Sequence, residues 1–355
     1  MSSDIYRPVE RGTAIGWFMS GTLIGPAFGP FVGGIIVTYS SWRTIFWLQT
    51  ALSGVGMLMT FFLVPETIHH KKLDDLVGFS RKRKAWAIMG MINPWRVLVL
   101  FKHLNLLLAA LASSSLVWNM YSLLTPIRYV LNPRFDLETP MLGGLFYLAP
   151  GVGYLIGTFL GGRWADMTVK RWIKKRNGTR VPEDRLRSAV PFIGVVIPGC
   201  ILIYGWSVDQ EVGGIPLPVI VLFIQGVAQL FCFPSINTYC LDVMPGRGAE
   251  VAAANFCLRY LAGCLGTAVV LPAIEGAGVG WFSTISAVLM IMSTGGLLAS
   301  IRWGQAWQKQ VKAKERARRA KNAAPSSAAD REEQATQPHE KGVESPGKVA
   351  DAPRQ

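Results

Sequence analysis

The feature that most constrains this chain is a run of glycines and prolines inside an apolar stretch, residues 21–47. In a water-soluble helix each internal proline would cost about 3 kcal/mol. In a lipid bilayer such residues are tolerated, because no water competes for the backbone hydrogen bonds and neighbouring helices satisfy the freed carbonyls. The stretch therefore predicts a membrane-spanning helix whose glycine face lets another helix approach closely. The residues recur at spacings of four: Gly25-Pro26, Gly29-Pro30 and Gly33-Gly34.

Composition supports a membrane protein and argues against a soluble enzyme. The 355 residues are 50% hydrophobic and 16% charged, which is typical of polytopic membrane proteins. Apolar stretches of roughly 20 residues match a bilayer core of about 30 Å, and a globular domain has little use for several of them. The five cysteines lie in apolar stretches, and the four histidines form no metal-ligand spacing. We therefore expect no enzyme activity, no metal site and no cofactor.

Hydropathy predicts an all-α polytopic fold with about eight spans. Each span is long enough to cross the hydrocarbon core as a helix. The expected spans are approximately Gly12–Val37, Trp42–Val64, Trp95–Thr125, Met141–Gly162, Ser188–Val208, Ile215–Leu241, Val251–Ile274 and Gly280–Ile301.

The net charge of +14 is explained by topology rather than by nucleic acid. Lysine and arginine concentrate in the segments 66–94 and 163–187 and in both terminal regions, whereas the intervening turns hold few basic residues. The segment 163–187 is the most basic loop, with Arg180 and Arg185 among its nine basic residues. Because cytoplasmic loops carry the excess of basic residues, the chain is expected to have both termini in the cytoplasm, with the plasma membrane as its location.

Several motifs in a fixed order resemble one known family. GxxxGPxxGG is formed by Gly25, Gly29, Pro30, Gly33 and Gly34. Val64-Pro65-Glu66-Thr67 resembles an LPET motif, and INTYCLDVMPGRGAEVAAANFCLR, residues 236–259, resembles an NTYLVDAFP…AAN..R run. The chain is thereby similar to the fungal twelve-helix drug:proton antiporters of the major facilitator superfamily, in particular the quinidine-resistance and dityrosine exporter group.

This resemblance implies two six-helix halves with a substrate cavity between them. The first expected span resembles the fifth helix of the family, so the chain is expected to be a truncated form without the first four helices. Residues 1–65 would hold the last two helices of the N-terminal half, and 66–94 a cytoplasmic linker. Residues 95–302 would form the six-helix C-terminal half, followed by a basic and then disordered tail, 303–355, with disorder from about residue 322.

The resemblance also assigns a cytoplasmic gating loop. Gly162, Asp166, Lys170 and Arg171 resemble the superfamily's GxxxDxxxRR loop, in which a carboxylate and basic residues latch two helices together. Met167 departs from that pattern, because many members have an arginine after the aspartate. An alternative is that this loop only maintains topology. Separately, Asp242 and Arg259 stand at the ends of two spans, and a charge near a membrane is expected to be paired, either between these two or between Arg259 and Asp166.

For the substrate cavity we select polar and aromatic residues that could face the bundle interior. Amides and aromatic rings in an apolar cavity suit amphipathic organic molecules, including cations that lie over aromatic faces. The alternative is that these side chains bind helices together through hydrogen bonds, each worth about 0.6 kcal/mol. The candidates are Trp118, Asn119, Tyr121, Tyr147, Tyr154, Gln225 and Gln229.

The function expected from the resemblance is proton-coupled export of small amphipathic organic molecules by alternating access. Its partners would be a small-molecule substrate, protons and membrane lipid, and no nucleic acid. The alternative is a transport-inactive membrane fragment that acts as a partner or decoy of full-length relatives. The sequence does not identify the substrate, the oligomeric state or the group that carries the proton.

Overall fold

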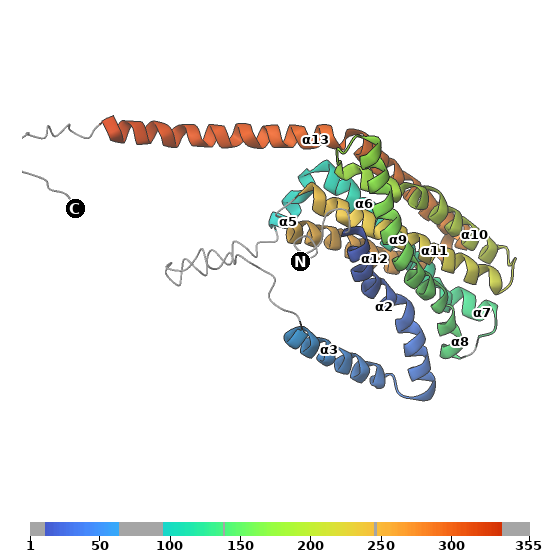
Figure 1. The fold of residues 1–355 in the computed structure, drawn as a ribbon. Helices are drawn as coiled ribbons and strands as arrows, with labels where there is room; N and C mark the ends of the chain where they lie inside the picture. The colour runs from blue at the N-terminus through green and yellow to red at the C-terminus, as the bar shows by residue number, and fades with distance from the viewer. Residues whose placement is uncertain (1–10, 64–94, 138, 245–246, 336–355) are drawn as a thin grey trace, which may run out of the picture. The chain divides into compact units, whose positions relative to one another are not determined.

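The computed structural model describes residues 11–63, 95–137, 139–244 and 247–335, and helices make up nearly all of them (Figure 1). Residues 1–305 and 306–355 form two separate units. In the first unit, the elements before α6 are α2 (Arg11–Tyr39), α3 (Arg43–Leu63), α5 (Trp95–Val99) and the short 3-10 helix η2 (Leu100–Lys102). The remaining elements are α6 (Leu104–Leu124), η3 (Ile127–Leu131), α7 (Asn132–Arg134), α8 (Pro140–Leu145), α9 (Leu148–Lys175), η4 (Pro182–Ser188), η5 (Phe192–Val196), α10 (Ile197–Asp209), α11 (Pro216–Val243), α12 (Gly248–Ala277) and α13 (Val279–Ala335).

Seven helical segments in the described part of the chain are long and apolar enough to cross a membrane. They correspond to the second to eighth spans expected from the sequence. The first expected span lies in α2, a helix of 29 residues that continues through Pro26 and Pro30. The polytopic helical bundle predicted from hydropathy is therefore confirmed.

The helices do not end where hydropathy places the ends of the spans. The third span was expected to begin at Trp95, but the extended backbone of His103, with φ −84° and ψ 102°, separates α5 and η2 from α6. At the other end, α9 continues to Lys175, thirteen residues beyond the expected end at Gly162. Hydropathy marks where a chain leaves the apolar core, whereas arginine and lysine are good helix formers and let the helix continue.

α11 lies at the centre of the main unit and packs closely against α9 (Figure 1). Three glycines of α9, at spacings of four, make this possible. A Cβ atom added at Gly153 would stand 2.5 Å from the carbonyl oxygen of Phe223, and one at Gly157 would stand 2.7 Å from the Cβ of Leu230. A Cβ at Gly161 would also collide with the Leu230 carbonyl. The two backbones thus touch along a seam that only glycine permits.

α2 packs against α8, α9 and α11, as expected for a glycine-rich face. The close approach occurs only near the C-terminal end of α2. A Cβ at Gly34 would lie 2.7 Å from the Pro140 carbonyl oxygen, and one at Gly144 would lie 3.1 Å from the Cα of Phe31. Cβ atoms at Gly25 and Gly29 would meet no described atom within 4 Å. The glycines of α9 at spacings of four, Gly153, Gly157 and Gly161, lie against α11 and not against α2.

The C-terminal region differs from the expectation of disorder from about residue 322. α13 is helical as far as Ala335, and 336–355 lie outside the described residues. The expectation was wrong for 322–335 because it used the lack of apolar periodicity alone. This stretch is rich in alanine and charged residues, which favour helix without any apolar face. The expected linker, 66–94, also lies outside the described residues.

Candidate functional site

One end of α9 carries a cluster of ion pairs, which we call the charge cluster. Arg185 of η4 is at its centre, with 1% of its side chain exposed. Its Nη1 donates to Oδ1 of Asp166 on α9 at 3.3 Å, and its Nε lies 3.8 Å from Oδ2 of Asp242 on α11. The cluster consists of Asp166, Arg176, Arg180, Asp184, Arg185, Arg187 and Asp242.

The rest of the cluster surrounds this buried core. Arg180 Nη2 donates to Asp242 Oδ2 at 2.6 Å, and Arg176 Nη1 donates to Asp184 Oδ2 at 2.7 Å. The guanidinium of Arg187 lies 4.1 Å from the ring centroid of Trp172 and 3.5 Å from Asp184. The aspartates of these pairs are buried, whereas the three arginines keep about a third of their side chains exposed, so water screens these outer pairs more than the pair at Arg185. α9, η4 and α11 are therefore connected by alternating positive and negative groups.

The four residues of the expected gating loop all lie on α9. Gly162 and Asp166 are buried, and Asp166 reaches the charge cluster. Lys170 and Arg171 are exposed and form no ion pair with a described residue. The helix thus brings the carboxylate of the motif into an ion-pair network but directs its basic residues elsewhere.

Asp242 and Arg259, expected as a pair, enter different interactions. Asp242 is bound by Arg180 and lies near Arg185. Arg259 is buried on α12, where its Nη2 donates to Asn237 Oδ1 at 3.1 Å and its guanidinium lies over the Phe233 ring at 4.3 Å. Asp166 also takes Arg185 instead of Arg259. Among the described residues neither acidic partner proposed for Arg259 pairs with it: the amide and aromatic groups of α11 hold Arg259, while Arg185 of η4 binds Asp166 and Arg180, just before η4, binds Asp242.

A polar cluster lies in the middle of the bundle, among α6, α9 and α11. Gln225 Nε2 donates to Gln229 Oε1 at 2.7 Å, and Tyr154 OH donates to the same oxygen at 3.3 Å. Gln229 Nε2 donates to the Leu116 carbonyl of α6 at 3.2 Å. All these side chains are buried. Asn119 is fully buried as well, yet neither its Oδ1 nor its Nδ2 bonds any described group.

The remaining substrate candidates point to other places. Trp118 Nε1 donates to Ser286 Oγ at 3.2 Å, so it faces α13. Tyr121 lies against Gly263 of α12. Tyr147 OH donates to the Leu124 carbonyl at 2.9 Å, and its side chain lines a pocket at the N-terminal end of α9. The seven candidates therefore do not converge on one cavity in this structure.

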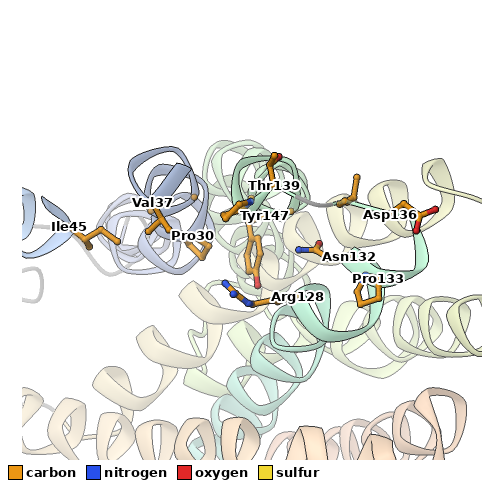
Figure 2. A pocket seen from close by; sticks show the side chains of 15 residues that line it. Pro30, Val37, Ile45, Arg128, Asn132, Pro133, Asp136, Thr139 and Tyr147 are labelled. Atoms are coloured by element: carbon orange, nitrogen blue, oxygen red, sulfur yellow. The ribbon is translucent and has the colours of Figure 1, made fainter. Parts of the chain in front are cut away.

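That pocket, which we call the α2–α8 pocket, has a volume of about 580 Å³. Pro30, Gly33, Gly34 and Val37 of α2 form one wall, Ile45 of α3 adds an apolar side chain, and residues between Arg128 and Tyr147 form the opposite wall (Figure 2). Three glycines and prolines of the antiporter-like motif, Pro30, Gly33 and Gly34, thus border it. Its volume is within the usual range of small-molecule sites, about 300–1,000 Å³.

The charge cluster lies toward the C-terminal end of α9, whereas Tyr147 of the α2–α8 pocket is the residue just before this helix. Tyr147 and Asp166 are nineteen positions apart along the chain, which corresponds to roughly 30 Å of helix. The two sites therefore lie near opposite ends of α9, one built from ion pairs and the other from a hollow between elements.

Several apolar helices long enough to cross a bilayer, packed into one bundle, define the chain as a polytopic membrane protein. A comparison with family models agrees: the model described as Major Facilitator Superfamily matches residues 1–267. The chain belongs to this superfamily, whose members are transporters rather than enzymes. The family predicted from the motifs is therefore confirmed.

Curated fungal relatives support this assignment. The chain is 26% identical to MFS-type transporter tstD of Talaromyces stipitatus, over 88% of the chain and 63% of that protein. It is 25% identical to Efflux pump radE of Floropilus chiversii, over 81% of the chain and 56% of that protein. It is 27% identical to Quinidine resistance protein 3 of Saccharomyces cerevisiae, over 64% of the chain and 33% of that protein. The chain thus spans less than two thirds of each of these relatives.

Sequence reasoning did not single out the central residues of either end. Arg180 appeared only as one of many basic residues in one segment, and the run Pro182-Glu183-Asp184-Arg185-Leu186 resembled the family without giving Arg185 a role. Pro182, Glu183 and Asp184 form the first turn of η4, and this helix start was the available signal for Arg185. Arg128 is one of two basic residues, with Arg134, in a turn otherwise poor in them, which was the corresponding signal for the pocket.

Proposed function

We propose that this chain takes part in the export of small amphipathic organic molecules, driven by a proton gradient and achieved by alternating access. The observation that carries the proposal is the charge cluster between α9, η4 and α11, in a chain of this superfamily. The efflux activity named in radE and the drug resistance named in a yeast relative support the export direction.

In this proposal the charge cluster acts as a latch. Arg185 lies between Asp166 and Asp242, so movement of α9 relative to α11 would lengthen one of these contacts. Separating buried ions without a new partner is costly, which favours the state in which all three groups are together. The latch would hold one conformation until substrate and proton binding stabilise another.

The proposal extends to organisation and placement. Residues 1–65 would supply two helices of one half-bundle, and residues 95–302 would form the other half. The basic ends would face the cytoplasm and the α2–α8 pocket the opposite side, because lysine and arginine are retained on the cytoplasmic side. The membrane would be the plasma membrane, with small-molecule substrate, protons and lipid as partners.

The test is flux in vesicles of defined orientation. Purified chain in phosphatidylcholine vesicles should move a fluorescent organic cation when a pH gradient is imposed, and the flux should stop when an ionophore dissipates the gradient. Asp166→Asn should change the rate without lowering the amount of inserted protein. Lys170→Gln is the matched control, because Lys170 lies one turn further along α9 and is exposed.

Two outcomes would contradict the proposal. Absence of gradient-dependent flux in correctly inserted protein would favour the second candidate, a transport-inactive partner or decoy of longer relatives. Loss of inserted protein in Asp166→Asn, in proportion to the loss of flux, would make the charge cluster a purely structural element.

A further inference from the structure

The α2–α8 pocket has an asymmetry in its charges. Its walls are mostly apolar or lack side chains, and no charged residue of α2 or α3 lines it. The charged residues that line the pocket are Arg128 and Asp136. In Figure 2 the Arg128 side chain extends toward the hydroxyl end of Tyr147, between η3 and α2, whereas Asp136 lies at the far edge with its carboxylate turned away from Tyr147. Among the described residues that line the pocket, the interior therefore has one cation and no facing anion.

Arg128 is not engaged elsewhere in the described part of the chain. It forms no hydrogen bond or ion pair with a described residue, in contrast to Arg134, six positions further on. Arg134 Nη1 donates to the carbonyls of Ser207 and Val208 at 3.1 and 2.9 Å. Arg134 therefore has a structural role, and Arg128 keeps its donors available to a ligand.

The pocket also excludes ligands without an apolar body. Pro30, Val37 and Ile45 on one side, with Leu137 and Pro140 on the other, present carbon surface. A guanidinium matches the planar, two-oxygen geometry of a carboxylate better than any point charge. Together these features select a flat or branched apolar molecule with one carboxylate.

We propose that the α2–α8 pocket binds small amphipathic carboxylates, with Arg128 as the residue that contacts the carboxylate. The ligand's apolar body lies between α2 and the segment 137–147, and its carboxylate lies beside Tyr147. This site is separate from the charge cluster, and its existence does not require flux. It adds an anion-selective binding step at the end of the bundle opposite the ion pairs.

The experiment measures binding by the full chain in nanodiscs of uncharged phosphatidylcholine. Three probes share one ring system and differ in the charge and hydrogen-bonding groups of a single substituent: tritiated 2-naphthoate, its amide 2-naphthamide, and 2-naphthylmethylammonium. The expected order is naphthoate tightest, by roughly tenfold over the amide, because a charge-assisted hydrogen bond is about twice as strong as a neutral one. The ammonium probe should bind most weakly.

Substitutions at two positions, Arg128 and Val37, separate the effect of charge from the effect of pocket volume. Arg128→Gln should remove the preference for naphthoate over naphthamide, and Arg128→Lys should keep part of it. Val37→Trp, which fills the pocket from α2, should weaken all three probes. Arg163→Gln is the control for charge, because Arg163 is exposed on α9 and does not line the pocket. Val195→Trp is the control for bulk, because Val195 is 73% exposed and does not line the pocket.

Equal binding of the three probes to the unmodified chain would overturn the proposal, as would unchanged naphthoate binding in both Arg128→Gln and Val37→Trp. Thermal unfolding of each variant shows whether it is folded, and Arg128→Lys keeps the test valid if Arg128→Gln is not. Naphthoate binding without vesicle flux would leave this site in place and reject export. Flux without naphthoate binding would reject the carboxylate site and leave the export proposal in place.

Discussion

The two ends of this bundle join helices by contacts of different kinds. At the charged end, a fully buried arginine connects two aspartates on α9 and α11, and further arginines surround them. At the other end, α2 and α8 meet through backbone at Gly34 and Gly144 and border a hollow of about 580 Å³. One end is held by specific charged contacts and the other by close backbone packing. The difference teaches that a substitution at the charged end removes a buried charge from its partners, whereas one at the pocket changes its shape or its exposed charge.

The largest expected effect tests the charged end. Replacing Arg185 with methionine leaves Asp166 and Asp242 without their shared cation in a buried site, and removal of one member of such a group costs about 3–5 kcal/mol. Thermal unfolding in nanodiscs measures the loss. Arg163→Met on the exposed face of α9 should change stability by less than about 0.5 kcal/mol. Equal stability of the two variants would mean that the charge cluster does not hold this end together.

The next effect tests the seam that connects the two ends. Gly157→Val would place side-chain atoms against the Leu230 side chain and the Val227 carbonyl, and overpacking of this kind costs about 1–3 kcal/mol. The same substitution at Gly295, where a Cβ meets nothing within 4 Å, is the control. Unfolding temperatures of the two variants give the comparison. If Gly295→Val were the more harmful, the α9–α11 contact would not be the tight one.

The third prediction compares the stability contributed by a hydrogen-bonded side chain with that of a side chain without a described partner, both in the middle of the bundle. Gln229→Leu removes the acceptor of Tyr154 and Gln225 and should destabilise by about 1–3 kcal/mol. Asn119→Leu removes an amide with no described partner and should be neutral or stabilising by about 1 kcal/mol. Chemical unfolding of both variants measures this. A large loss in Asn119→Leu would show that this amide has a partner, such as buried water.

The smallest effect is expected at the pocket. Arg128→Gln should alter the free energy of unfolding by less than about 0.5 kcal/mol, because the side chain is exposed and forms no hydrogen bond with a described residue. The same variant is expected to lose the preference for naphthoate. The Arg185 and Arg128 variants together test the comparison most directly, because Arg185 is expected to stabilise the fold and Arg128 to bind the ligand. Similar destabilisation by both would remove the distinction.

Much of the fold followed from the sequence because a bilayer imposes strict requirements on it. Apolar length predicted the spans, and the order of the motifs predicted the family, which the comparison confirmed. The limits of the helices were less predictable, since hydropathy does not detect a charged helix such as the end of α9. The site residues were the least predictable, because their partners come from distant elements: Asp242 was expected to meet Arg259 and instead meets Arg180.

The sequence by itself determined that this protein is a membrane bundle, and its glycines at spacings of four marked helix faces that another helix could approach closely. Only the tertiary structure decided which contacts these are. Gly153, Gly157 and Gly161 lie against α11, whereas Gly25 and Gly29 of the equally regular motif in α2 have no described neighbour within 4 Å. The physical reason is that a pattern along one helix specifies a face, but the helix that occupies that face is selected by the packing of the whole bundle.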